Sequence, residues 1–190
     1  MTNVYLRDDF NTAPPQLTGV AVELVMDSYR IIGELRSQGG PRRLVDILNA
    51  VDASFILVHD GRLDDPLVED DEPRDFEVVQ LHLNTLLFAV PRGTLADVGN
   101  PVEAVRKVPV PATIALPGFE VTGNIHLLPE ADPKRTALMG SRHFVPMTDA
   151  TVIAAFNRNR VWREPIVVVN LARAVLFAPK GAGTTRDPSL

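Results

Sequence analysis

Apolar and polar residues alternate along two neighbouring stretches near the start of the chain. A period of two is typical of a β-strand that buries one face. Residues around Asp27 and Ser28 separate the two stretches and predict a turn. The apolar positions are Val20, Val22 and Leu24 before the turn, and Tyr29, Ile31, Gly33 and Leu35 after it. The pattern therefore predicts two consecutive strands.

The same pattern returns later in the chain and indicates an internal repeat. Val20 matches Val110, which lies 90 positions further on, and Gly33 matches Gly123 at the same offset. A glycine inside a strand predicts a bulge or a sharp bend. From Phe55 to Ala89 the offset is 89 without a gap. Its matched residues are Phe55, Val58, Asp60, Leu63, Val78, Leu87, Phe88 and Ala89 with Phe144, Met147, Asp149, Val152, Val167, Leu176, Phe177 and Ala178.

Each half continues with a short helix and three further strands. In the first half, Pro41 suits the first position of a helix over residues 41–49, since proline is favoured there. A third strand is expected to end at Asp60-Gly61, and a tight turn at Asn84-Thr85 predicts a closing hairpin. The expected ranges are 41–49, 54–59, 76–83 and 86–90 in the first half, and 132–140, 143–148, 165–171 and 174–178 in the second.

These elements predict a mainly β protein built from two tandem small half-open β-barrel-like units. The units are related by the internal repeat, and each carries a short helix. A unit of this size is barely large enough to form a stable hydrophobic core of its own, which favours packing of the two units against each other. The expected ranges are an N-terminal segment 1–17, a first unit 18–93, a connector 94–105, a second unit 106–181 and a flexible tail 182–190.

The order of elements resembles that of Sm-type and SH3-like barrels, which have a strand with a central glycine and a closing hairpin. Three motifs are also similar to small bacterial β domains of uncharacterised function. They are Tyr-x-Ile-x-Gly-x-Leu at residues 29–35, Leu-x-Asp-x-Leu at residues 44–48 and Phe-x-x-x-x-Asp at residues 55–60. The resemblance implies a fold and transfers no catalytic residue.

Composition narrows the class of protein. The 190 residues are 45% hydrophobic, a share typical of a folded globular chain rather than a disordered one. The absence of cysteine excludes a disulfide scaffold, a thiolate zinc site and a cysteine nucleophile. No apolar run reaches the roughly 18–20 residues of a membrane-spanning helix, and the N-terminus has no signal-peptide pattern. We therefore expect a cytoplasmic protein without membrane insertion.

Catalytic motifs are absent from the sequence, which predicts no enzymatic activity and no cofactor. The four histidines form no His-Glu-x-x-His pattern, so no metal site is expected either. Asp60 and Asp149 match between the halves. They could act as paired carboxylates in acid–base chemistry or form a shared cation site, or could satisfy backbone N–H groups in a turn. The turn is the preferred interpretation, because Asp60-Gly61 is a common turn pair.

Charge distinguishes the two halves. The chain has a net charge of -5, but its negative charge is concentrated in one acidic loop, residues 64–77. In this loop eight acidic residues and one arginine sum to -7. The matching loop 157–164 is basic and holds the only tryptophan. Arginine beside tryptophan is a combination that contacts acidic protein surfaces or nucleic acid. The candidate partner-binding residues are Arg158, Arg160, Trp162 and Arg163.

Two functions follow from these observations. The first is a non-enzymatic interaction or scaffold protein that engages a protein partner or assembles with itself through its two β units. Halves of opposite charge suit a head-to-tail assembly. The alternative is a nucleic-acid-binding or regulatory Sm-like module that uses the basic second unit.

Overall fold

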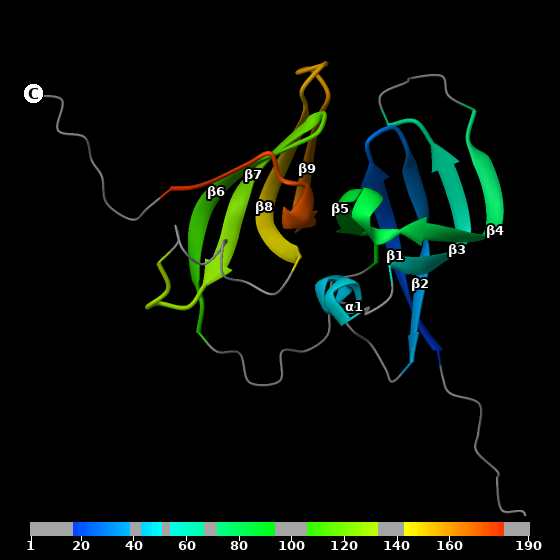
Figure 1. The fold of residues 1–190 in the computed structure, drawn as a ribbon, viewed down its shortest axis with the longest axis horizontal. Helices are drawn as coiled ribbons and strands as arrows, with labels where there is room; N and C mark the ends of the chain where they lie inside the picture. The colour runs from blue at the N-terminus through cyan, green and yellow to red at the C-terminus, as the bar shows by residue number, and fades with distance from the viewer. Residues whose placement is uncertain are drawn as a thin grey trace, which may run out of the picture.

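The computed structural model describes residues 17–38, 43–50, 54–66, 72–93, 106–132 and 143–180. Within these ranges the chain forms ten strands, one helix and two short 3-10 turns (Figure 1). The elements are β1 (Leu17–Met26), β2 (Arg30–Gln38), α1 (Leu44–Ala50), β3 (Phe55–Asp64), β4 (Arg74–His82), η1 (Leu83–Thr85), β5 (Leu86–Pro91), β6 (Val108–Leu116), β7 (Phe119–Leu127), β8 (Phe144–Ala154), β9 (Val161–Asn170), η3 (Leu171–Arg173) and β10 (Leu176–Pro179). The prediction of a mainly β fold is confirmed.

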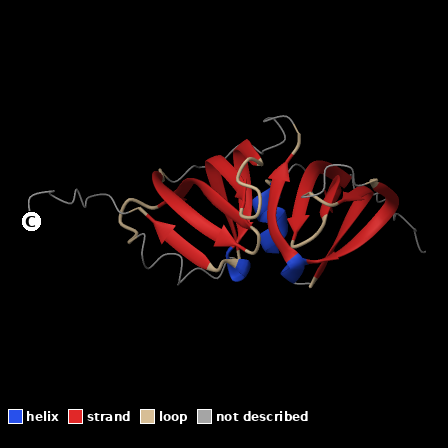
Figure 2. Cartoon of the chain, turned by 90° about the horizontal axis from the view of Figure 1, so that it is seen from above, coloured by secondary structure: helices blue, strands red, loops and turns tan. Residues whose placement is uncertain are grey.

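The ten strands form a single antiparallel sheet that is not closed. Their order is β10-β6-β7-β8-β9-β5-β1-β2-β3-β4. The first five strands therefore lie in the order 5-1-2-3-4, and the last five follow the corresponding order 10-6-7-8-9. The halves join where β5 pairs with β9, through Phe88 opposite Val169 and Ala89 opposite Val168. Figure 2 shows an elongated molecule with helical segments, α1 among them, near its middle.

Two clusters of buried apolar side chains form the core. Alternating positions of β1 and β2, such as Val22, Leu24 and Ile31, lie in the first cluster with one face of α1. Ile114, Phe119 and other residues of the second half lie in the second cluster. Burial of a large aliphatic or aromatic side chain contributes about 1.5–3 kcal/mol, so these two faces hold most of the stabilising energy. The period of two in the sequence correctly identified them.

Gly33 and Gly123 lie where two ladders shift register. The shift is between Ile32 and Glu34 in β2, and between Thr122 and Asn124 in β7. A Cβ at Gly123 would meet the backbone oxygen of Thr148 at 2.8 Å, and a Cβ at Gly33 would meet the oxygen of His59 at the same distance. The expected bend at these glycines is confirmed, and the neighbouring strand leaves no room for a side chain.

Substitution Gly123→Ala is expected to lower the free energy of unfolding by about 1 to 2 kcal/mol, because backbone must move to admit the methyl group. Chemical denaturation measures the change. Gly19→Ala is the matched control, since its Cβ would meet only the flexible end of Glu34. Equal losses in the two variants would contradict the role of close packing at Gly123.

The third strand does not end at Asp60 as the sequence predicted. β3 continues to Asp64, and its counterpart β8 runs through Asp149 to Ala154. Asp60 and Asp149 both adopt a φ of 51°, in the left-handed region that aspartate tolerates better than most residues. Each aspartate is therefore a bulge inside a longer strand, beside the register shift at the facing glycine.

The closing hairpin is also a wrong prediction. η1 separates β4 from β5, and β5 then pairs with β1 instead of folding back on β4. The side chain of His82 accepts a hydrogen bond from the backbone N–H of Asn84 and caps η1. Asn170 caps η3 in the same way through Ala172. The chain turns a corner at these sites because each cap ends the preceding strand.

The strand ladders of the two halves differ by one residue from the match that the sequence predicted. Val58 pairs with Val79 in the first half, whereas Met147 pairs with Val167 in the second. The offset is therefore 89 in β3 but 88 in β4. It stays at 88 in β5, where Pro91 and Pro179 face Val22 and Ala112. One residue fewer therefore separates the paired positions of β8 and β9 than those of β3 and β4, so the gapless match from Phe55 to Ala89 is wrong beyond β3.

Several expected segments fall outside the described residues. They are residues 133–140 of the expected helix 132–140, the whole connector 94–105, the whole tail 182–190, residues 1–16 of the segment 1–17, and residues 67–71 of the acidic loop. The basic loop is shorter than expected, because β9 begins at Val161. Among the described residues, no helix is long and apolar enough to cross a membrane.

Candidate functional site

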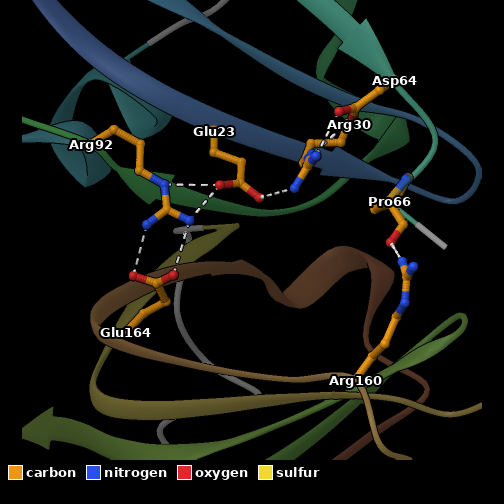
Figure 3. Close-up of polar contacts among 7 residues, drawn as sticks. All are labelled: Glu23, Arg30, Asp64, Pro66, Arg92, Arg160 and Glu164. Atoms are coloured by element: carbon orange, nitrogen blue, oxygen red, sulfur yellow. Dashed lines mark hydrogen bonds and ion pairs between the residues drawn. The ribbon is translucent and has the colours of Figure 1, made fainter. Parts of the chain in front are cut away.

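The four candidate partner-binding residues do not share one surface. Arg158 is exposed in the loop before β9, and Arg163 is exposed within β9. Trp162 packs against the second core cluster, and its ring centroid lies 6.2 Å from that of Phe119. Arg160 donates a hydrogen bond to the backbone oxygen of Pro66 in the first half (Figure 3). Arg160 therefore contacts the first half, whereas Trp162 packs in the core of the second half.

The two matched aspartates bind separate partners. The carboxylate of Asp60 accepts a hydrogen bond of 3.2 Å from Arg36, and that of Asp149 accepts one of 3.2 Å from Asn124. β3 and β8 are separated in the sheet by four other strands. The two carboxylates are thus placed to hold their own bulges rather than to form a pair. Within the described residues, no group of three His, Asp or Glu side chains could hold a metal ion.

An ion-pair network crosses the junction of the halves (Figure 3). The guanidinium of Arg92, just after β5, donates to Glu23 of β1 at 2.8 Å and to Glu164 of β9 at 3.0 Å. Arg30 lies 3.6 Å from the other oxygen of Glu23 and also binds Asp64. Burial is the largest single influence and works to lower the pKa of Arg92. The hydrogen bonds from Arg92 to Glu23 and Glu164, together with the attraction of their negative charges, outweigh burial and raise that pKa above its ordinary value. Arg92 therefore stays charged and holds two carboxylates together.

Two asparagines add polar contacts across the junction. The side-chain amide of Asn49 in α1 donates to the backbone oxygen of Phe144 at 2.8 Å, and its oxygen accepts from the Phe144 N–H at 3.1 Å. Asn170 donates to the backbone oxygen of Leu86 at 2.9 Å and is buried. Both side chains satisfy backbone groups that the junction would otherwise leave without a partner.

Apolar side chains are exchanged between the halves. Phe144 and Val168 of the second half lie in the first core cluster, and Ile166 packs against it. Phe88 and Val90 of the first half lie in the second cluster. The Phe88 and Phe119 rings meet edge to face at 5.3 Å. Each core is therefore completed by residues of the other half.

Two sheet edges have no neighbouring strand within the described part of the chain. They are β4 and β10, which end the sheet on opposite sides of the molecule (Figure 1). The cross-strand pairs place Phe55, Leu57 and Val78 on the same face of β3 and β4, which we call the outer face. All three side chains are exposed. Leu176, the first residue of β10, and Val175 just before it are also exposed. Exposed apolar residues therefore lie at both open edges of the sheet.

The sequence interpretation did not single out the junction residues. Glu23 offered a signal, because it is the only charged residue between Val20 and Met26 and such a residue needs a partner once buried. Val161 and Trp162 were a second signal, because β-branched and aromatic residues are enriched in strands. No local signal pairs β5 with β9, since that contact joins residues far apart in the chain.

Comparisons of the chain with family models, curated proteins and solved structures give no match. The resemblance to Sm-type barrels and to small bacterial domains therefore remains a prediction.

Proposed function

We propose that this chain is a non-enzymatic interaction or scaffold protein that engages a protein partner through the open edge of its sheet. Its two halves are tandem barrel-like units related by an internal repeat. The common strand order, the register shifts at Gly33 and Gly123 and the left-handed Asp60 and Asp149 support the repeat.

The observation that carries the proposal is the outer face of β3 and β4. Its matched face on β8 and β9 packs against the first core, with buried Phe144 in the place of Phe55 and partly buried Ile166 in the place of Val78. On β3 and β4 the same positions face solvent. One half buries this face and the other exposes it. We therefore expect the partner to resemble in shape the part of the chain that covers the matched face on β8 and β9.

Charge restricts which partner fits the β4 edge. Asp75 and Glu77 lie on β4 and are exposed, and Glu72 precedes the strand. Charged side chains on an edge oppose indiscriminate strand pairing. A partner with apolar and basic residues at its own edge could pack against the exposed apolar face and form ion pairs with these carboxylates.

The alternative, nucleic-acid binding by the second half, has weaker support. Trp162 packs in the core and Arg160 contacts Pro66, so the proposed stacking surface is reduced to Arg158 and Arg163. Titration with labelled single-stranded oligonucleotides tests it. Tight binding that weakens steeply with salt and with Arg158→Ala would favour this function over the first.

Replacement of Phe55 and Leu57 by aspartate is expected to abolish assembly. Native mass spectrometry of the chain isolated from its own cell should show a mass above that of the 20.8 kDa monomer, and the double variant should lose the excess. Both side chains are exposed, so the isolated fold should survive. Leu17→Asp is the control, because Leu17 is equally exposed but lies outside this face. A chain that is monomeric and without a bound protein would contradict the proposal.

A further inference from the structure

We infer that the occupant of the β4 edge is the β10 edge of a second copy of this chain, joined in the register that β9 and β5 use within the chain. The inference rests on the proposed function, because it names the partner of the same edge.

The internal junction supplies the register. Within the chain, Val169 of β9 faces Phe88 and Val168 faces Ala89. At the offset of 88 established by the ladders, β9 corresponds to β4 and β5 corresponds to β10. The matched pairs between two copies are therefore Leu81 opposite Leu176, and Gln80 opposite Phe177.

Exposed side chains coincide with the residues that the internal junction buries. Leu87 and Phe88 are 0% and 4% exposed, whereas the matched Val175 and Leu176 are 76% and 50% exposed. On the other edge, Phe144 is 4% exposed and the matched Phe55 is 44% exposed. Apolar residues at both free edges thus occupy the positions that pack when two halves meet. A second copy would bury both sets at once.

Polar groups at the free edges repeat those of the junction. His82 caps η1 through Nδ1, as Asn170 caps η3 through its amide oxygen. A neutral His82 ring whose Nδ1 accepts carries its proton on Nε2. That N–H is then available to donate, as the Asn170 amide donates to the oxygen of Leu86. In a second copy the matched oxygen belongs to Ala174.

Charge at the two edges is complementary. The N–H of Lys180 donates to the oxygen of Pro111 at 2.7 Å, just as that of Arg92 donates to Ala21 at 2.8 Å. Lys180 therefore takes the place of Arg92, which binds a carboxylate across the internal junction. The position on β4 that matches Glu164 is Phe76, and the exposed Asp75 and Glu77 flank it along the strand. Opposite charge favours this pairing over two β4 edges or two β10 edges.

Such a contact joins two different surfaces and leaves one free edge on each outer copy. Association therefore continues until the ends meet in a ring, or extends as an open chain. The structure of one chain already contains one copy of the contact, so assembly requires no new type of interface.

Two complementary variants test the inference. Val78→Asp blocks the β4 edge and Leu176→Asp blocks the β10 edge, and both residues are exposed in the isolated chain. Each variant alone should be monomeric by native mass spectrometry. An equimolar mixture should form a dimer of one copy of each and nothing larger, since each variant keeps one functional edge. Unchanged assembly in either variant, or a mixture that stays monomeric, would overturn the inference.

A cysteine pair tests the register in a chain that has no cysteine of its own. Mixed Gln80→Cys and Phe177→Cys chains should form an interchain disulfide on mild oxidation, because facing residues in antiparallel strands lie within disulfide range. Gln80→Cys with Leu17→Cys is the control, and its yield should be at least about tenfold lower. Equal yields would overturn the register.

The outcomes separate this inference from the proposed function. A monomeric chain that holds a different protein and releases it on Phe55→Asp/Leu57→Asp substitution overturns the second-copy occupant and leaves the proposed function standing. A monomeric chain without any partner overturns both.

Discussion

Replacement of Arg92 by methionine is expected to lower the free energy of unfolding by about 3 kcal/mol. Removing one member of a buried ion pair costs about 3–5 kcal/mol, because the remaining charge is left desolvated. The expected loss for Arg92→Met is at the lower end of this range, because the Arg92 side chain is 36% exposed and Arg30 still lies near Glu23. Methionine keeps an apolar stem, so the loss reports the charge rather than a cavity. Urea denaturation with a linear extrapolation measures it.

A double-mutant cycle compares Arg92→Met with Glu23→Gln and with the variant that carries both substitutions. Without a charge at position 23, part of the penalty disappears, and we expect the double variant to be more stable than Arg92→Met alone. Arg43→Met is the control, since its pair with Asp46 is exposed and such pairs contribute about 0.2–1 kcal/mol. Additive losses at Arg92 and Glu23 would show that the two groups do not interact.

Local sequence patterns predicted the individual strands and their bends well. Val22, Leu24 and Ile31 are buried as their alternation indicates, and Gly33 and Gly123 lie at register shifts. Each of these features depends on neighbours within a few residues. The ends of β3 and β8 were placed too early, because Asp60 and Asp149 were interpreted as turn residues when their left-handed φ builds a bulge instead.

The junction could not be predicted in the same way, because it depends on contacts between distant residues. Asn49 binds Phe144, and Phe88 enters the second core, yet nothing close to either residue in the sequence identifies its partner. Trp162 looked like an exposed loop residue because arginines surround it in sequence. In the sheet, alternation directs Trp162 inward and Arg163 outward.

Phe88→Ala is expected to destabilise the whole chain by about 3–5 kcal/mol, the usual loss for a buried phenylalanine. Phe88 is nearly fully buried, and its ring lies against Phe119. It belongs to a strand of the first half but packs in the second core. The fluorescence of Trp162, the only tryptophan, reports unfolding near the junction, and far-UV circular dichroism reports both halves.

The control for Phe88 is its matched residue at the free edge. Leu176→Ala, measured in the Val78→Asp background to keep the chain monomeric, should change the stability by no more than about 0.5 kcal/mol, since exposed positions contribute little. If the halves are stabilised by exchanged side chains, the fluorescence and dichroism transitions of Phe88→Ala should shift together to lower denaturant. Two separate transitions, with only one of them shifted, would show that each half folds alone. The junction would then be a weak contact between finished domains rather than the completion of two cores.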